Sequence, residues 1–307
     1  MATKISKRNI FVVGGAGFIG SHLSESLLSR GNRVVILDHA PFALSGVKAY
    51  KMDIGDAKKV DRIFKKERPE VVFHLAGAMH LRRSPQDPLF SKDLDFLSRT
   101  AAILDACKKY RVKKIMFVSS GGAIYENAKS VPTKETYPPS PNSLYGLANL
   151  MTEKYIEAYC KNNRMGFTIL RVSNAYGPRQ WQSGVIPSFI LKIMKGERPV
   201  INGTGRQTRD FIYIDDLVSA LILLAKKGKN EVYNVGSGQE ISLKKVFELT
   251  KKLLGSNVKA EYGSPRFFEV QRSAPDNKKI KKELRWNPKT GMEEGLKKTI
   301  EWLKKNY

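Results

Sequence analysis

Short, almost wholly apolar segments alternate with amphipathic helical segments through the first half of this 307-residue chain. Strands made of Val, Ile, Leu and Phe are buried on both faces, as happens when helices cover both sides of a parallel sheet. The pattern predicts strands at 9–13, 33–37, 71–75, 114–119 and 166–171, and helices at 21–30, 57–67, 90–110 and 143–161. The sequence therefore predicts an α/β fold with a doubly wound parallel sheet.

The second half of the chain has a different texture. Prolines, glycines and loop residues follow the last of these strands, and a lysine-rich helical segment closes the chain. We expect a first domain at 1–173 and a smaller α/β domain at 174–307. Elements around 205–236, with a helical pattern at 214–225 and a strand at 232–235, are expected to return to the first domain.

A glycine-rich turn joins the first predicted strand to the first predicted helix. Gly14 permits a tight turn, Gly17 allows a pyrophosphate to approach the backbone, and Gly20 lets the helix pack closely. Phe18 and Ile19 lie where the helix opens, and its first amides and positive dipole end favour phosphate. The turn therefore predicts a dinucleotide site to which all five residues contribute.

An aspartate ends the second predicted strand. Asp38 can accept hydrogen bonds from the adenosine ribose hydroxyls, and its charge would repel a 2′-phosphate. The residues that follow, His39 to Phe42, supply no arginine or lysine for such a phosphate. The sequence therefore favours NAD over NADP. Asp53 and Ile54, after the next extended segment, are expected to meet the adenine.

The charge balance is strongly basic, with 54 Lys and Arg against 29 Asp and Glu and a formal net charge of +25. Such a balance can mark a nucleic-acid surface, because neutralising phosphates dominates that binding. The basic residues are however dispersed at helix-surface spacing, without interleaved aromatic residues. We expect a solvated basic surface and no dedicated nucleic-acid site. Its field would also attract a doubly anionic substrate.

No apolar run reaches the ~18 residues that a membrane span requires. The apolar stretch at 10–20 contains four glycines and lacks the cleavage site of a signal peptide. Cys107 and Cys160 are far apart, without the spacing of metal ligands. We therefore expect a cytoplasmic protein with reduced thiols, no membrane segment and no metal site.

Several further motifs, in chain order, resemble those of the extended short-chain dehydrogenase/reductases, in particular the NAD-dependent epimerase/dehydratase family. Besides the glycine turn they are His74-Leu75-Ala76-Gly77, Phe117-Val118-Ser119-Ser120, Ser143-Leu144-Tyr145-Gly146, Tyr176-Gly177-Pro178-Arg179-Gln180 and Thr208-Arg209-Asp210-Phe211. Similar sequences include UDP-glucose 4-epimerases. The resemblance runs from about residue 9 to 288 and implies a Rossmann fold, NAD as cofactor, and a nucleotide-sugar substrate. It also implies that Leu75, Ala76 and Gly77 line the cofactor.

The chemistry that the resemblance implies is transient oxidation of a UDP-hexose at C4. Tyr145 would take the hydroxyl proton while a hydride passes from the sugar to NAD, and the hydride would return to the other face. Asn174, Arg209 and Arg266 are implied to bind the diphosphate, for which guanidinium forks are suited.

The catalytic residues depart from the family pattern. The family lysine, one helical turn after the tyrosine, is replaced by Asn149, and Lys154 lies on a different helical face. The family serine aligns with Gly121, so that Ser120, one position earlier, is the candidate to assist Tyr145. Asn149 is expected to bond the nicotinamide ribose, so cofactor binding should survive better than turnover.

The loss of the lysine leaves several functions open. An ammonium about 5 Å from the phenol, at an effective dielectric near 20, contributes roughly 3 kcal/mol, or about two pKa units. The chain is therefore an epimerase with weakened turnover, a catalytically impaired protein that binds NAD or a nucleotide sugar, or an engineered variant without its lysine. Another nucleotide-sugar reductase or decarboxylase is a further alternative. Gly122 and Ala123 stand where dehydratases have an Asp-Glu pair, which argues against 4,6-dehydration.

Two of the predicted helices, 90–110 and 143–161, carry more apolar residues than one core-facing stripe needs. These residues are Leu94, Leu97, Leu147, Leu150, Met151 and Ile156. In similar proteins the two helices form a four-helix dimer interface, so we expect a homodimer, with a monomer as the alternative. The sugar is not readable from the sequence. Arg82 and Arg83 could favour an acidic sugar, but a solvated loop is the preferred interpretation.

Overall fold

The chain folds into two compact units. The computed structural model describes residues 8–76, 91–126, 128–180, 184–265 and 270–307. Unit 1 comprises Met1–Ile124, Pro141–Arg171 and Val218–Tyr233, and unit 2 comprises Tyr125–Ser140, Val172–Leu217 and Asn234–Tyr307. The backbone therefore passes between the units several times, and neither unit is one continuous stretch of sequence.

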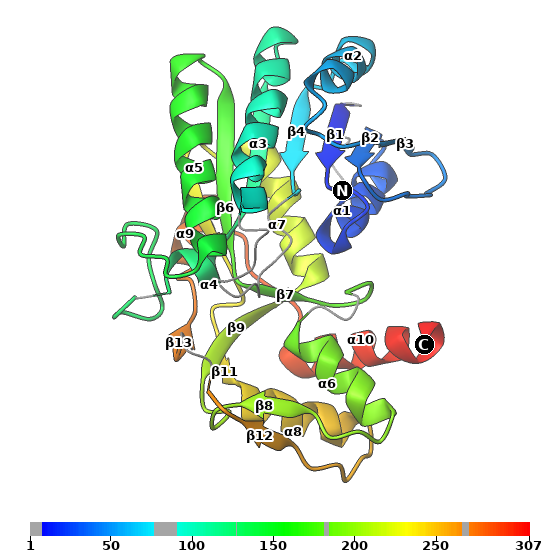
Figure 1. The fold of residues 1–307 in the computed structure, drawn as a ribbon, viewed down its shortest axis with the longest axis vertical. Coiled ribbons are helices and arrows are strands. Elements are labelled where there is room, and N and C mark those ends of the chain that lie inside the picture. The colour runs from blue at the N-terminus through cyan, green and yellow to red at the C-terminus, as the bar shows by residue number, and fades with distance from the viewer. Residues whose placement is uncertain (1–7, 77–90, 127, 181–183, 266–269) are drawn as a thin grey trace. The chain divides into compact units, whose positions relative to one another are not determined.

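A seven-stranded sheet forms the centre of unit 1, in the order β3-β2-β1-β4-β5-β6-β10 (Figure 1). Its strands are β1 (Asn9–Val13), β2 (Arg33–Asp38), β3 (Lys48–Lys51), β4 (Val71–His74), β5 (Lys114–Ser120), β6 (Gly166–Val172) and β10 (Val232–Val235). The pairs β2–β3, β1–β2, β1–β4 and β4–β5 are parallel. The strand order reverses between β1 and β4, which is the topological switch point of a doubly wound fold.

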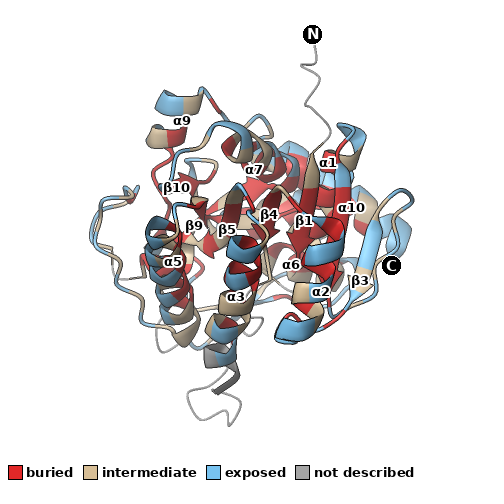
Figure 2. Ribbon diagram, turned by 90° about the horizontal axis from the view of Figure 1, so that it is seen from above, coloured by how far each residue is buried: buried red, intermediate tan, exposed pale blue. Residues whose placement is uncertain are grey.

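Helices cover both faces of this sheet (Figure 2). One face carries α1 (Phe18–Ser29) and α7 (Ile214–Lys227), and the other carries α2 (Ala57–Glu67), α3 (Ser91–Lys109) and α5 (Leu144–Asn162). The apolar residues of β1, β2 and β4 are buried, which is why these strands contain so little else. The predicted doubly wound fold is confirmed. Across the described ranges, none of the helices has the length and hydropathy to cross a membrane.

Local capping signals set the helix boundaries in unit 1. The carboxylate of Asp56 accepts from the backbone N–H of Lys59 at 3.0 Å, so α2 begins at the predicted residue. The hydroxyl of Ser143 accepts from the N–H of Gly146 at 3.1 Å at the start of α5. The helix after the glycine turn begins three residues earlier than predicted, because Gly17 itself is the N-cap of α1.

Unit 2 is built on short strands and four helices among its described residues. Strand β9 (Thr208–Tyr213) pairs with β7 (Asn174–Tyr176) and β13 (Arg272–Ser273) in parallel and with β11 (Glu240–Ser242) antiparallel. A separate parallel pair joins β8 (Val200–Asn202) to β12 (Glu261–Gly263). The helices are α6 (Val185–Met194), α8 (Leu243–Leu253), α9 (Lys278–Leu284) and α10 (Met292–Asn306). An edge-to-face contact between Phe189 and Phe247 packs α6 against α8.

The two cysteines are free and buried, one on α3 and one on α5. Burial raises the pKa of the Cys160 thiol to about 12 and that of the Cys107 thiol well above its usual value. Because the thiolate is the reactive form, these side chains behave as small apolar groups of the core.

Candidate active site

The glycine turn follows β1 at the switch point, and the fold itself requires two of its glycines. Gly14 has a φ of +83°, and a Cβ there would lie 2.5 Å from the backbone nitrogen of Ala76. A Cβ on Gly20 would lie 2.2 Å from the carbonyl oxygen of Gly14. No side chain fits at either position without a backbone shift.

Gly17 differs from its two neighbours in the motif. Its φ is −72°, which any residue adopts, and an added Cβ would meet only the carbonyl oxygen of Gly14, at 3.4 Å. Internal packing therefore leaves the choice of glycine unexplained, whereas close approach of a pyrophosphate explains it. No side chain caps α1 and no acidic residue occupies its first turn, so the amides of Phe18 and Ile19 suit an anionic group.

Asp38 is buried at the end of β2 beside the glycine turn. One carboxylate oxygen accepts from the N–H of Ala16 and the other from the N–H of Ala40, both at 2.9 Å. These bonds fix the carboxylate, and each oxygen has a further lone pair with which to accept a ribose hydroxyl. The residues present therefore fit a dinucleotide whose adenosine ribose carries no 2′-phosphate.

The end of β4 forms a second wall against the turn. The N–H groups of Leu75 and Ala76 both donate to the carbonyl of Val13, at 2.8 and 3.0 Å. This bonding places the backbone of Ala76 beside Gly14, and the cofactor-lining role of Leu75 and Ala76 stays a prediction. Gly77, the third residue predicted there, lies outside the described residues.

The two residues predicted at the adenine differ in burial. Ile54 is buried, whereas the side chain of Asp53 is 56% exposed. The Asp53 carboxylate accepts from the N–H of Gly55 at 2.8 Å and from the Arg99 guanidinium at 3.1 Å. Asp53 is thus held at the surface by a local turn and an ion pair with α3.

The catalytic candidates come together at the end of β5 and the start of α5. Tyr145 lies in the first turn of α5, and the side chains of Ser120 and Asn149 lie near enough to its phenol to lower the phenol's pKa. Ser120 is the last residue of β5 and also accepts from the N–H of Ala123, at 3.3 Å. The three residues therefore form one cluster although Ser120 is a position away from the family serine.

Burial dominates the electrostatics of this cluster. It raises the pKa of the Tyr145 phenol, and the hydrogen bonds from Ser120 and Asn149 lower the pKa without cancelling the effect. Asn149 is buried, and its amide nitrogen donates to the carbonyl of Tyr145 at 2.8 Å. No cation among the described residues acts on the phenol. The group in the place of the family lysine is therefore neutral and tied to the helix backbone.

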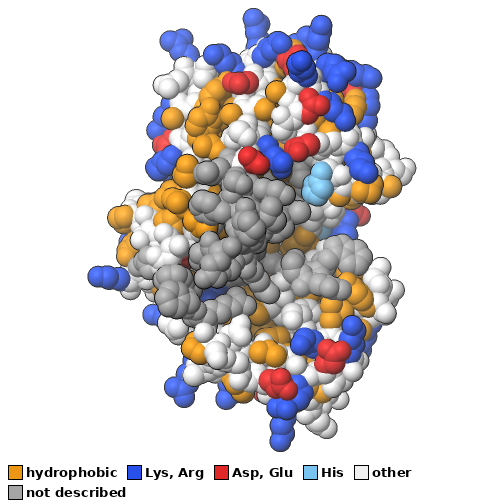
Figure 3. Space-filling view, viewed as in Figure 1, with side chains coloured by type: hydrophobic (Ala, Val, Ile, Leu, Met, Phe, Trp, Pro, Cys, Tyr) orange, Lys and Arg blue, Asp and Glu red, His pale blue; other side chains and the backbone are white. Residues whose placement is uncertain are grey.

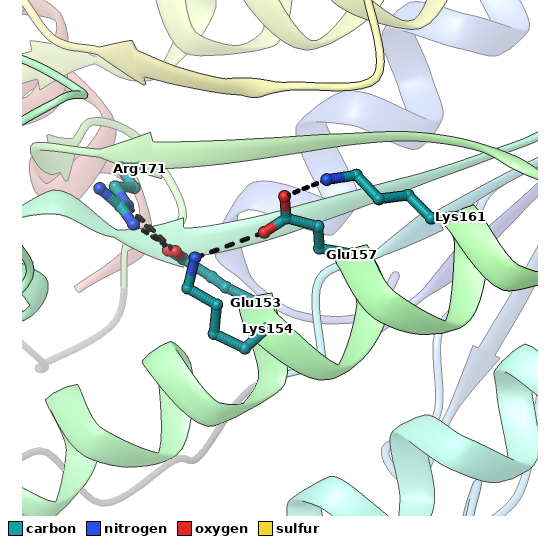
Figure 4. Close-up of polar contacts among 5 residues, drawn as sticks. All are labelled: Glu153, Lys154, Glu157, Lys161 and Arg171. Atoms are coloured by element: carbon teal, nitrogen blue, oxygen red, sulfur yellow. Dashed lines mark hydrogen bonds and ion pairs between the residues drawn. The ribbon is translucent and has the colours of Figure 1, made fainter.

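The next turns of α5 carry charged side chains that pair with one another or with β6 (Figure 4). Lys154 is 65% exposed and pairs with Glu157 at 3.4 Å, and Glu157 also pairs with Lys161 at 2.7 Å. Glu153 instead pairs with Arg171 of β6 at 2.6 Å, with both side chains buried. Lys154 does not approach the phenol, as its helical spacing predicted.

The segment after β5 carries no acid pair. It forms the short helix α4 (Gly121–Ile124), whose four side chains contain neither a carboxylate nor a hydroxyl. Gly121 and Ala123 are buried, so the position of the family serine lies under the start of α5. The chain thus lacks at this position the acid and base that the dehydratase reaction requires.

In unit 2, two of the predicted diphosphate ligands lie on neighbouring strands. Asn174 is on β7 and its amide donates to the carbonyl of Asp210 at 3.1 Å. The guanidinium of Arg209, on β9, donates to the carbonyls of Thr208 and Val270 at 2.8 and 2.7 Å. The third ligand, Arg266, and the loop arginines 82 and 83 lie outside the described residues.

Asp210, beside Arg209, is a buried carboxylate that the sequence analysis did not single out. It is fully buried, and its carboxylate accepts from the N–H groups of Ser237 and Gly238, each at 2.8 Å, and from the Ser173 hydroxyl at 3.1 Å. Burial raises its pKa and these bonds lower it. The available signal was a carboxylate directly before the run Phe211, Ile212 and Tyr213 of β9.

A match to a known family accounts for this set of residues. Residues 10–236 match the NAD dependent epimerase/dehydratase family. The chain belongs to this family. The family's dependence on NAD agrees with the cofactor inferred from Asp38 and the glycine turn, so NAD is the cofactor of this family member. NAD supplies an acceptor, and later a donor, of hydride.

Individual relatives resemble this epimerase/dehydratase along nearly its whole length. The structure of UDP-glucose 4-epimerase from Thermotoga maritima with UDP-glucose has a TM-score of 0.91 and 38% identity, covering 97% of this chain and 99% of that one. The structure of the Thermus thermophilus UDP-glucose 4-epimerase in complex with NAD has a TM-score of 0.89 and 32% identity, and the match covers 96% of this chain and 98% of that one. The UDP-glucose 4-epimerase from Mycolicibacterium smegmatis is 31% identical in sequence, over 95% of this chain and 97% of that protein. The predicted fold class and family are thereby confirmed.

Proposed function

We propose that the chain is an NAD-dependent nucleotide-sugar 4-epimerase that acts on a UDP-hexose, with Tyr145 as its base. The observation that carries the proposal is the cluster at the start of α5, in which the side chains of Ser120 and Asn149 lie beside the phenol of Tyr145. The similarity to UDP-glucose 4-epimerases supports the choice of substrate class.

In the oxidising half of the reaction, the phenolate of Tyr145 accepts the proton of the C4 hydroxyl. The C4–H bond breaks with its electron pair leaving for the bound cofactor, and a C4 carbonyl forms. Ser120 holds the phenol and can also donate to the developing oxyanion. After the keto sugar turns over, Tyr145 returns the proton and the hydride arrives on the opposite face.

The neutral Asn149 sets the rate of this reaction. Since burial raises the pKa of Tyr145 and no cation among the described residues offsets this rise, the phenolate is a small fraction at neutral pH. An ammonium at the Asn149 position would contribute about two pKa units, which corresponds to roughly a hundredfold in phenolate fraction. The proposed enzyme is therefore slow at neutral pH and accelerates in alkali.

The diphosphate of the substrate is proposed to bind to unit 2. Asn174 and Arg209 lie on paired strands there, and their donors suit phosphate oxygens, with Arg266 as the third proposed ligand. Firm binding of the diphosphate with loose binding of the sugar would allow the keto sugar to turn over. Unit 1 is proposed to hold NAD and Tyr145, so each unit has one binding task.

A homodimer through α3 and α5 is also part of the proposal. On α5, Leu147, Met151 and Tyr155 are 45, 38 and 38% exposed and stand four residues apart, on one helical face. Ile156, expected in the same apolar set, is instead buried in the core. A second copy of the chain would cover the exposed stripe.

A second candidate function is a protein that binds NAD or a nucleotide sugar without turnover. The neutral, buried surroundings of Tyr145 favour it, because they suppress the phenolate without affecting the cofactor turn. Binding and catalysis would then be separated in this chain.

The experiment that distinguishes the two incubates purified protein with NAD and a panel of UDP-sugars and follows the sugar products by chromatography. Turnover that disappears in Tyr145→Phe supports the epimerase. Turnover only after Asn149→Lys means that the site is intact except for its missing cation. Binding of NAD and UDP-sugar without turnover in either protein would leave the binding function.

A further inference from the structure

Arginine occupies an unusual backbone position in this chain. In the described ranges, every non-glycine residue with a positive φ is an arginine: Arg68, Arg111, Arg164, Arg179 and Arg285. The left-handed region is unfavourable for residues with a Cβ, and helices normally end there with glycine or asparagine. The chain does use glycine in this way at Gly31, Gly196 and Gly255. The arginines therefore carry a backbone cost that a glycine would avoid.

Three of these arginines lie along one edge of the unit 1 sheet. Arg68, Arg111 and Arg164 follow α2, α3 and α5 and precede the neighbouring strands β4, β5 and β6. Backbone hydrogen bonds join the three turns, from the N–H of Lys113 to the carbonyl of Glu70 at 2.9 Å and from Gly166 to Lys113 at 3.2 Å. The row lies at the amino ends of the strands, whereas the glycine turn follows the carboxyl end of β1.

A lysine also precedes each of these three arginines by three residues, in the last helical turn. The lysines are Lys65, Lys108 and Lys161, and all are exposed. Figure 3 shows Lys and Arg side chains gathered over the ends of α2, α3 and α5. Six exposed cations here form no salt bridge with any described residue, and we call them the basic edge: Lys65, Lys66, Arg68, Lys108, Arg111 and Arg164.

Two carboxylates near this edge are already paired with other cations. Asp61 pairs with Lys109 at 2.7 Å, and Glu70 pairs with Lys113 at 2.8 Å. Arg68 stacks over the ring of Tyr110, 4.9 Å from its centroid, so its guanidinium is held in position. The members of the basic edge thus form no salt bridge with a described residue, although Lys65 acts on the Asp61 carboxylate from a distance, and Arg68 is preorganised.

We propose that the basic edge binds the sugar–phosphate backbone of a nucleic-acid duplex, independently of base sequence and of the NAD site. Helix α2 packs on α3 and α3 on α5, and packed helices lie roughly 8–10 Å apart. This spacing corresponds to about three base pairs along one strand, at about 3.4 Å each. Guanidinium forks match phosphate oxygens, which accounts for arginine in place of glycine at these three left-handed positions of the edge.

Other polyanions fit the basic edge less well. Stable adsorption of a protein surface to an anionic membrane normally adds inserting apolar side chains to the cations, and the exposed large apolar residues of the described chain lie elsewhere. Single strands are bound through exposed aromatic rings, which the described part of this edge lacks. The lysines, dispersed in sequence, gather because three helices end at the same sheet edge. This proposal replaces the expectation of a merely solvated surface.

The test uses the full chain with NAD and a fluorescent DNA duplex of about 20 base pairs, measured by anisotropy between about 50 and 200 mM salt. The variant Arg68→Gly/Arg111→Gly/Arg164→Gly removes three guanidiniums at positions where glycine is favourable. Loss of three phosphate contacts predicts a fall in affinity of a few hundredfold near 0.1 M salt and a log–log slope smaller by about 3. Its melting temperature and NAD binding should stay at or above those of the unmodified protein.

A control variant removes the same charge from exposed positions of unit 2, as Arg285→Gly/Lys245→Gln/Lys304→Gln. A much smaller loss of affinity in this control supports the proposal. Equal losses in both variants would overturn it in favour of a general charge effect, and so would failure of the unmodified protein to bind the duplex at about 50 mM salt. Arginine-dependent binding to phosphatidylserine vesicles without duplex binding would also overturn it, and assign the basic edge to membranes.

Discussion

The side-chain amide of Asn149 donates to the backbone carbonyl of Tyr145 at 2.8 Å, one helical turn away. A lysine at this position would extend past the carbonyl and bring a positive charge toward the phenol. The shorter amide instead satisfies a helix carbonyl and contributes one neutral hydrogen bond to the phenol. The catalytic consequence of the substitution is therefore electrostatic, because the fold around Tyr145 is intact.

Asn149→Lys should lower the pKa of the Tyr145 phenol by about two units. The base works deprotonated, so below its pKa the rate falls about tenfold for each pH unit, and the variant's acid limb moves to lower pH. At neutral pH, turnover should rise by up to about a hundredfold. Initial rates between about pH 6 and 10 measure this shift. Lys154→Asn is the control, and an identical profile for Asn149→Lys would refute the electrostatic account.

Gly17→Ala and Gly20→Ala should affect different properties of the protein. At Gly17 the new Cβ meets only one carbonyl oxygen at 3.4 Å, so the cofactor-free protein should melt normally while the rise in melting temperature caused by NAD is lost. At Gly20 the Cβ would lie 2.2 Å from a backbone oxygen, so the fold itself should lose about 1–3 kcal/mol. Thermal melts with and without NAD separate the two effects. A normal NAD response in Gly17→Ala would exclude the pyrophosphate from that position.

Asp38→Asn should weaken the preference for NAD over NADP. The amide oxygen can still accept from Ala16, but the negative charge that repels a 2′-phosphate is gone. Because a hydrogen bond to a charged group contributes about 1.5–3 kcal/mol, the ratio of the two affinities should change by about tenfold or more. Calorimetric titration with each cofactor gives the ratio. Asp53→Asn, at the exposed aspartate, should leave the ratio unchanged.

The double variant Leu147→Glu/Met151→Glu should be a monomer if α5 forms a dimer interface. Two carboxylates placed on the exposed stripe would repel their copies across a two-fold axis. Sedimentation velocity at micromolar concentration gives the oligomeric state, and Met194→Glu, an exposed apolar residue of α6, is the control. An unmodified chain that sediments as a monomer would contradict the proposed interface.

The sequence predicts the unit 1 sheet well because burial on both faces leaves little choice of residue. Strands β1, β2 and β4 are apolar at nearly every position, and α2 is bounded by its own capping aspartate. The short strands of unit 2 are different. Strand β13 has two residues and exists because Arg272 pairs with Thr208, far away in the sequence. Such strands have no periodicity to detect, since tertiary pairing alone creates them.

The part of the candidate site in which a motif fixes the backbone could be predicted from the sequence. The part that depends on how far a side chain extends could not. The spacing of Gly14, Gly17 and Gly20 defines the cofactor turn from the sequence alone. Whether Ser120 lies near the phenol depends on the residue at which β5 ends. Comparison with the family motif could not locate that end to within one residue. The basic edge was invisible for a related reason, because only the sheet order makes α2, α3 and α5 end side by side.

The buried pair between Glu153 and Arg171 should be far more important for stability than the exposed pairs of Glu157 on the same helix (Figure 4). Glu153→Leu leaves a guanidinium buried without its counter-charge, so unfolding free energy should fall by about 3–5 kcal/mol. Glu157→Leu breaks only solvent-screened pairs and should cost less than about 1 kcal/mol. Urea denaturation of both variants gives the comparison. Similar losses would mean that Arg171 finds another partner or water once Glu153 is removed, and that the pair does not anchor α5 to β6.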